Sequence, residues 1–101
     1  MKTIGVIGTG QMGAGIMQVS ALAGYETIGY DQRSEAGEQA IQTIERMLKI
    51  ATRKEGLPQE KADAAKTRLR TTTNLSDLAA CDLVIEAIVE NIEVNARFLR
   101  S

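Results

Sequence analysis

Three glycines near the amino terminus, Gly8, Gly10 and Gly13, have the spacing G-x-G-x-x-G and follow the apolar run Thr3–Ile7. Between a strand and a helix, the first glycine permits a sharp turn and the second leaves room for a pyrophosphate against the backbone. The third lets the helix pack closely on the strand, and the free N–H groups at the helix start attract an anion. The motif therefore predicts a dinucleotide pyrophosphate site, and the alternative is a tight turn without a ligand.

An acidic residue follows the second predicted strand. Asp31 ends the β-branched run Glu26–Tyr30, roughly 20 residues after the glycines, where a carboxylate accepts hydrogen bonds from the adenosine ribose. A carboxylate disfavours a 2′-phosphate because two anions would be forced together, so NAD is preferred over NADP. Arg33 argues against this preference for NAD, since a guanidinium can pair with the 2′-phosphate of NADP. The alternative is that Arg33 is a solvated surface arginine.

Composition excludes several classes of partner. The 101 residues form one domain or part of one, and the net charge of −1 gives no general attraction to nucleic acid or to an anionic membrane. No apolar run approaches the ~20 residues of a membrane span. Met1 and Lys2 lead straight into a strand, so we predict no signal peptide and a cytoplasmic location. The single cysteine, Cys81, has apolar neighbours and is expected to be a buried thiol.

The chain contains no histidine. A dehydrogenase usually needs a base that titrates near neutral pH, and histidine is the common choice. Its absence leaves these residues without the commonest candidate for such a base. We also predict no metal site.

The apolar runs predict an α/β fold. This is a Rossmann-type parallel sheet with strand order 3-2-1-4 and a long helical pair inserted after the second strand. Strands are expected over residues 3–7, 26–30, 70–74 and 82–87, and helices over 11–23, 35–53 and 58–69. A turn or short helical loop is expected over 75–80. A last helix should open at Glu90, with Ile92, Ala96 and Leu99 at helical spacing.

Side-chain spacing also predicts helix faces and caps. The first helix is expected to face the sheet with Met12, Ile16, Val19 and Ala23. The expected apolar stripe of the second comprises Ala40, Ile41, Ile44, Met47, Leu48 and Ala51. Ser34 and Ser76 are predicted caps, and Pro58 a predicted first helical residue.

Three stretches resemble the 3-hydroxyacyl-CoA dehydrogenase family, which includes 3-hydroxybutyryl-CoA dehydrogenases. They are residues 4–16 (IGVIGTGQMGAGI), 70–75 (RTTTNL) and 83–91 (LVIEAIVEN). The likeness covers the whole chain and keeps the long helical insertion. It implies an oxidoreductase of fatty acid metabolism that oxidises L-3-hydroxyacyl-CoA to 3-ketoacyl-CoA with NAD.

The resemblance also implies roles for individual residues. The pyrophosphate would be held by Gly8, Thr9, Gly10, Gln11, Met12 and Gly13, and the adenosine end by Asp31 and Gln32. Ala87 and Glu90 would lie along the nicotinamide side. Asn95 stands where the family often has a lysine near the cofactor. Lys54 falls where the family has a lysine that contacts CoA; the alternative is one charge of a solvated face with interleaved acids.

The family's catalytic histidine, glutamate, serine and asparagine, and its helical carboxyl-terminal domain, lie beyond the equivalent of Ser101. We therefore expect residues 1–101 to be the amino-terminal portion of a dinucleotide-binding domain that is inactive alone, with the whole enzyme a homodimer. The fourth strand would then leave an apolar edge, which predicts self-association or a disordered carboxyl terminus. The alternatives are a non-catalytic nucleotide-binding module, a crystallin-like structural relative, and a CoA-independent β-hydroxy acid dehydrogenase.

Overall fold

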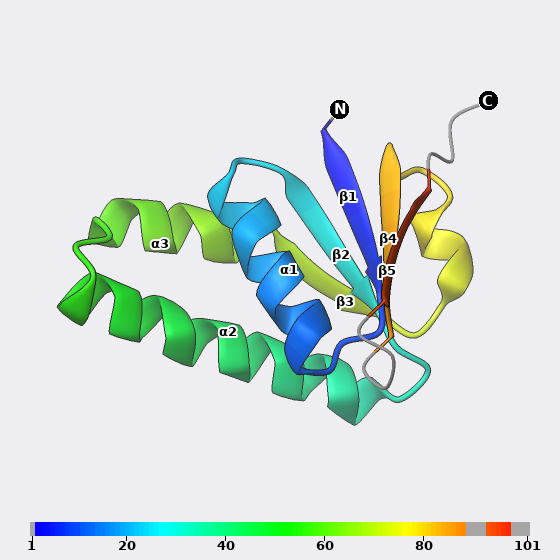
Figure 1. Cartoon of the computed structure of the whole chain (residues 1–101), viewed down its shortest axis with the longest axis horizontal. Helices are drawn as coiled ribbons and strands as arrows, with labels where there is room; N and C mark the ends of the chain where they lie inside the picture. Colours follow the sequence, from blue (N-terminus) through cyan, green and yellow to red (C-terminus); the bar gives the residue numbers. More distant parts are fainter. Residues whose placement is uncertain (1, 89–92, 98–101) are drawn as a thin grey trace.

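The computed structural model describes residues 2–88 and 93–97. Its elements are β1 (Thr3–Ile7), α1 (Gln11–Leu22), β2 (Glu26–Tyr30), α2 (Ser34–Lys54), α3 (Gln59–Thr67), β3 (Leu69–Thr72), the 3₁₀ turn η1 (Leu75–Leu78), β4 (Leu83–Ile88) and β5 (Glu93–Arg97). The sheet order is β3-β2-β1-β4-β5, as seen in Figure 1. β1, β2, β3 and β4 are parallel, which confirms the predicted 3-2-1-4 arrangement.

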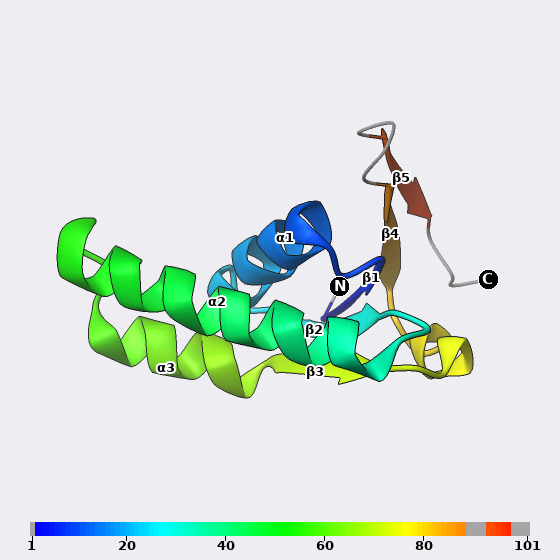
Figure 2. The same cartoon turned by 90° about the horizontal axis from the view of Figure 1, so that it is seen from below.

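Successive side chains of β1 point to opposite faces of the sheet, and each face has its own buried cluster. Ile4 and Val6 are buried in a core formed with α1, α2 and α3. On the other face, Gly5 lies against Leu78 and Cys81 near η1. α2 and α3 pack side by side and both contact α1 (Figure 2). These layers leave the carboxyl ends of the parallel strands as one open edge, where the functional site lies.

Cys81 is 1% exposed, which confirms the predicted buried thiol. Burial raises the pKa of this thiol, and the nearby Asp82 carboxylate raises it further, against a smaller opposing effect of Arg70.

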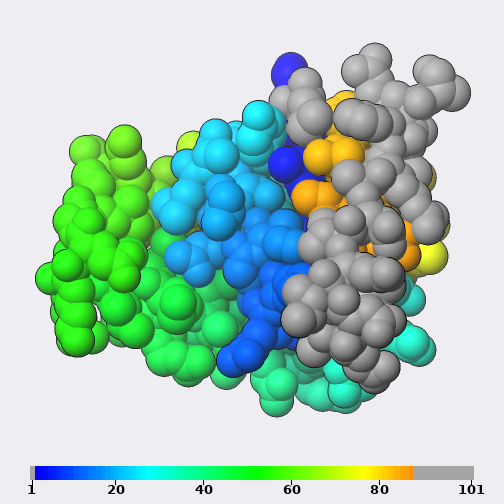
Figure 3. All heavy atoms as spheres, in the orientation of Figure 1, coloured from blue at the N-terminus to red at the C-terminus, as the bar shows by residue number. Residues whose placement is uncertain are grey.

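The face that α1 turns to the sheet differs from the prediction. Gly13, Ala14, Met17, Ser20 and Ala21 are buried, whereas Val19 is 68% exposed. Close contact of Gly13 with the end of β1 sets the rotation of the helix, so residues four and eight positions later share its buried face. Side chains of α1 accordingly reach the surface in Figure 3, where the helix is blue.

This rotation predicts unequal costs for two truncations in α1. Met17→Ala should lower the free energy of unfolding by about 3 kcal/mol, because Met17 is fully buried and the change leaves a cavity. Val19→Ala should change it by less than about 0.5 kcal/mol, since most of that side chain is already in water. Urea denaturation of both variants measures the difference. Equal losses would contradict the assigned faces.

The long helix α2 agrees with the predicted stripe except at one position. Ala40, Ile44, Leu48 and Ala51 are buried and Ile41 packs against the same core, but Met47 is 46% exposed. Met47 is therefore at the margin of the stripe rather than in the core.

The predicted caps are shifted by one or two residues. Ser34 is the first residue of α2, whose N-cap is Arg33, and Pro58 is the N-cap of α3 rather than its first residue. The cap of η1 is Asn74, whose side chain accepts hydrogen bonds from the Ser76 backbone N–H at 3.1 Å and from its hydroxyl at 2.8 Å. Asparagine is favoured here because its side chain reaches the amide two residues on.

The predicted last helix is wrong over residues 93–97. Glu93–Arg97 forms β5, which pairs antiparallel with β4 in the register Glu86↔Asn95. The helical spacing of apolar residues competes there with strict polar–apolar alternation in the sequence EVNAR, and pairing with β4 favours the extended form. The same pairing removes the predicted unpaired edge of β4, so that reason for self-association no longer holds.

None of the helices in the described part of the chain has the length and apolar composition needed to cross a bilayer.

Candidate functional site

The site lies at the carboxyl ends of β1, β2 and β4, where strand order reverses around β1. Gly8 follows β1 with φ +94°, a conformation that side-chain-bearing residues rarely adopt. Its N–H donates to the Tyr30 carbonyl at 2.9 Å, and a Cβ added at Gly8 would lie 2.6 Å from the Ala87 carbonyl oxygen. Only glycine therefore lets these three strand ends meet.

The loop from Gly8 to Gly13, which leads into α1, forms a concave arrangement of backbone that we call the glycine cradle. Gly10 is the N-cap, with extended backbone and no side-chain cap, and the Ala14 N–H donates to its carbonyl at 2.8 Å. The three preceding amides in the helix have no acceptor within the helix. At Gly13, an added Cβ would lie 1.8 Å from the Gly8 carbonyl oxygen, so the loop and helix touch through backbone. This arrangement fits a pyrophosphate held by N–H groups at a helix start.

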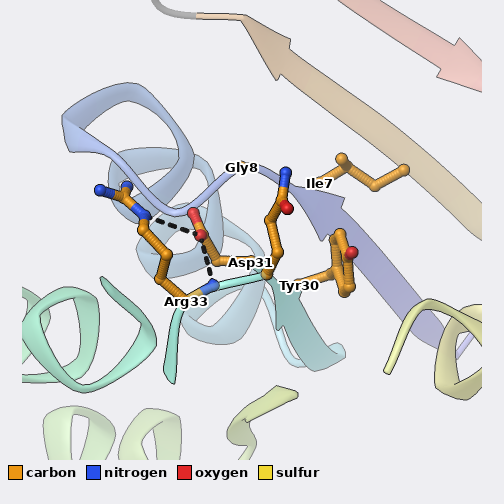
Figure 4. Close-up of a pocket in the computed structure, with 6 residues that line it drawn as sticks. Ile7, Gly8, Tyr30, Asp31 and Arg33 are labelled. Carbon is orange, nitrogen blue, oxygen red and sulfur yellow. Dashed lines mark hydrogen bonds and ion pairs between the residues drawn. The ribbon is translucent and has the colours of Figure 1, made fainter. Parts of the chain in front are cut away.

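Asp31 is fixed by four donors from two loops, and Figure 4 shows the two that come from Arg33. Its Oδ2 accepts from the Thr9 hydroxyl at 3.1 Å and from the Thr9 N–H at 3.4 Å. Its Oδ1 accepts from the Arg33 N–H at 3.0 Å and from Arg33 Nε at 3.4 Å. The carboxylate therefore connects the glycine loop to the start of α2.

The ionised form of Asp31 is favoured. Partial burial alone would raise the pKa of this carboxyl, but the hydrogen bonds from Arg33 and Thr9 outweigh that effect and lower the pKa below its ordinary value. The group is thus an anion at neutral pH, which makes it a strong acceptor for ribose hydroxyls.

An open hollow of about 550 Å³ lies beside this carboxylate. It is lined by Ile7, Gly8, Tyr30, Asp31, Gln32 and Arg33. The labelled residues of Figure 4 show that the end of β1 and the end of β2 form its walls. The hollow therefore adjoins both the glycine cradle and the acid.

The structure brings most of the proposed cofactor residues together. Gln11 and Met12 are in the first turn of α1, Gln32 is exposed beside Asp31, and Ala87 adjoins Gly8. Asn95 is in β5, paired with Glu86 of β4. Glu90 lies outside the described residues.

Lys54 is not close to this cluster. It is the exposed last residue of α2, a 21-residue helix that begins near the site and is about 30 Å long. A lysine in the last turn also stabilises the helix through its dipole, which is an alternative reason for its presence.

Sequence reasoning gave Arg33 no role in binding Asp31 and assigned the Thr9 side chain no separate function. A signal existed for Arg33, because aspartate often accepts from the amide two residues on. The Thr9 contact joins residues 22 positions apart, so only the pairing of β1 with β2 reveals it.

Comparison with known proteins agrees with this geometry. Residues 3–101 match the family model described as 3-hydroxyacyl-CoA dehydrogenase, NAD binding domain. The chain is 44% identical over 93 residues to a probable 3-hydroxybutyryl-CoA dehydrogenase of Deinococcus radiodurans, covering 89% of this chain and 32% of the relative.

Two crystal structures have a similar fold. (S)-3-hydroxybutyryl-CoA dehydrogenase from Ralstonia eutropha gives a TM-score of 0.84 at 34% identity, over 90% of this chain and 32% of that one. The 3-hydroxybutyryl-CoA dehydrogenase of Escherichia coli K12 gives 0.83 at 40% identity, over 88% and 19%. The chain spans between about a fifth and about a third of the length of the curated relatives it matches. On these grounds the chain belongs to the 3-hydroxyacyl-CoA dehydrogenase family, whose NAD-binding domain it matches.

Proposed function

We propose that this chain supplies the NAD-binding part of an enzyme that oxidises L-3-hydroxyacyl-CoA to 3-ketoacyl-CoA. The observation that carries the proposal is the bare cradle between Gly8 and Gly13 beside a fixed, ionised Asp31. When bound there, NAD supplies the acceptor for the hydride of the substrate.

The residues of the chain bind and orient the dinucleotide. The loop Gly8–Gly13 holds the pyrophosphate through the free backbone amides at the start of α1, and Asp31 with Gln32 holds the adenosine end. Ala87 lies along the nicotinamide side, supported by its place against Gly8 at the end of β4. Glu90 and Asn95 are assigned to the same side by family resemblance.

The proton of the substrate hydroxyl goes to a group outside these residues, as the family resemblance implies, and the chain itself contains no histidine. By resemblance, a histidine oriented by a glutamate takes this role in the remainder of the enzyme, and a helical domain completes the substrate cleft. Residues 1–101 then form an amino-terminal part of the cofactor domain. The homodimeric state and the cytoplasmic location stay predictions.

Lys54 is proposed as a contact for the polyanionic CoA moiety. Its support is exposure at the end of α2, within a helical pair rich in basic residues. Since Lys54 is distant from Asp31, it would contact the substrate rather than the cofactor.

Titration of the purified chain with NADH tests the proposal. We expect saturable binding, followed by calorimetry or by NADH fluorescence, and competition by ADP-ribose. The same protein should not oxidise 3-hydroxybutyryl-CoA, since the base is missing. Absence of NADH binding would contradict the assigned site, and turnover by the pure chain would contradict the assigned division of roles.

A further inference from the structure

Thr9 occupies the second position of the glycine motif, and its side chain is almost completely enclosed, at 4% exposure. Its hydroxyl donates to Asp31 Oδ2 at 3.1 Å. Its methyl group lies close to β2, because a Cβ added at Gly29 would be 3.1 Å from Thr9 Cγ2. Both branches of the side chain therefore have defined partners on the neighbouring strand.

The two oxygens of Asp31 have different surroundings. Oδ2 accepts from buried Thr9, whereas Oδ1 accepts from the Arg33 backbone and from a guanidinium whose side chain is 70% exposed. Each oxygen also accepts one backbone N–H, so the two differ in their side-chain donors. Exchange of the exposed guanidinium contact at 3.4 Å costs little, whereas the Thr9 hydroxyl belongs to a residue that is only 4% exposed. Oδ1 is therefore the oxygen available to a ribose hydroxyl.

We propose that Thr9 is a positioning residue: its buried hydroxyl holds Oδ2 of Asp31 and thereby presents Oδ1 to the ribose of NAD. This inference rests on the proposed function. The role differs from pyrophosphate binding, which uses backbone amides and is indifferent to the side chain. It also explains why a β-branched hydroxyl residue suits this turn, since the methyl packs while the oxygen donates.

Among the described residues, the charged side chain that contacts Asp31 is that of Arg33, which lies in the connection between β2 and α2. Thr9 from the β1–α1 loop and Gln32 beside the hollow are neutral. A rise of the Asp31 pKa in a Thr9 variant therefore reports the loss of the Thr9 hydroxyl.

Thr9→Val tests the proposal, because it keeps the buried shape and removes only the hydroxyl donor. Thr9→Ser is the matched control, which keeps the donor and removes the methyl. We expect Thr9→Val to weaken NADH binding about tenfold, as loss of one hydrogen bond to a charged group predicts, while Thr9→Ser stays within about threefold of the unaltered protein. Circular dichroism verifies the fold of each variant.

Titration of the Asp31 carboxyl by NMR, without any nucleotide, supplies a second readout. Its pKa should rise in Thr9→Val and stay low in Thr9→Ser, because only serine keeps the hydroxyl that donates to Oδ2. If the unaltered chain does not bind NADH, the proposed function fails. If it binds and Thr9→Val binds equally or more tightly, the positioning role is overturned. An unchanged Asp31 pKa in Thr9→Val overturns it as well.

Discussion

Replacing Gly13 by alanine is expected to abolish NADH binding and to lower the free energy of unfolding by about 3 kcal/mol or more. The added Cβ would lie 1.8 Å from the carbonyl oxygen and 2.8 Å from the carbonyl carbon of Gly8. Both are backbone atoms of the loop itself, so no side-chain rotation relieves the contact. α1 would have to move away from β1, which dismantles the cradle.

Gly15→Ala is the matched control for this experiment. Gly15 is in the same helix, two positions further on, and a Cβ there has nothing within 4 Å. Because alanine is a better helix former than glycine, this variant should gain about 0.5–1 kcal/mol and bind NADH normally. Denaturant titration and calorimetry compare the two. If Gly13→Ala binds NADH as well as Gly15→Ala does, the close approach of helix and loop is not what builds the site.

The central strands were predictable because their sequence and their place in the fold agree. One strand is Thr3–Ile7, which ends at the glycine turn, and the other is Glu26–Tyr30, which ends at an acid. Both runs are mostly apolar or β-branched, and they form β1 and β2 with the expected bounds. Both are parallel strands with a neighbouring strand on each side, and a continuous apolar run is typical of a strand in that position. The glycine motif and Asp31 follow these strands, so the strand ends bring them together.

The errors occur where local sequence favours two outcomes. α1 carries apolar residues around its circumference, and spacing alone does not show that Gly13 decides which side is buried. Residues 93–97 fit helical and alternating patterns, and β4 selects between them. The contacts of Asp31 with Thr9 depend on tertiary pairing, and no count of residues along the chain reveals which donor reaches which oxygen.

Asp31→Asn is expected to weaken NADH binding about 30-fold while affecting NADPH less, so the preference for the non-phosphorylated cofactor declines. The substitution keeps the shape of the side chain but removes the charge. It also replaces one acceptor oxygen by an NH₂ group, and this group cannot accept the hydrogen bond that a ribose hydroxyl donates to the carboxylate. For NADPH, the lost hydrogen bond is offset by the removal of repulsion between the carboxylate and the 2′-phosphate. Parallel titrations with both nucleotides measure the change in preference.

Asp63→Asn provides the control, because Asp63 is an acid on α3 whose side chain is 61% exposed and far from the hollow. It should leave both affinities unchanged. An equal loss for NADH and NADPH in Asp31→Asn, or the same loss in the control, would contradict recognition of the ribose by Asp31.

The same variant has an expected signature in stability. The pKa of Asp31 is lowered in the folded chain, so its ionised form contributes stability above the unfolded value near 3.8, and this contribution is lost as pH falls through the folded pKa. The difference in unfolding free energy between the unaltered chain and Asp31→Asn should therefore be greatest at neutral pH and shrink below about pH 4. Urea titrations from pH 3 to pH 7 measure it. A pH-independent difference would mean that the carboxylate gains nothing from Thr9 and Arg33, and would remove the physical basis for treating it as a preorganised anion.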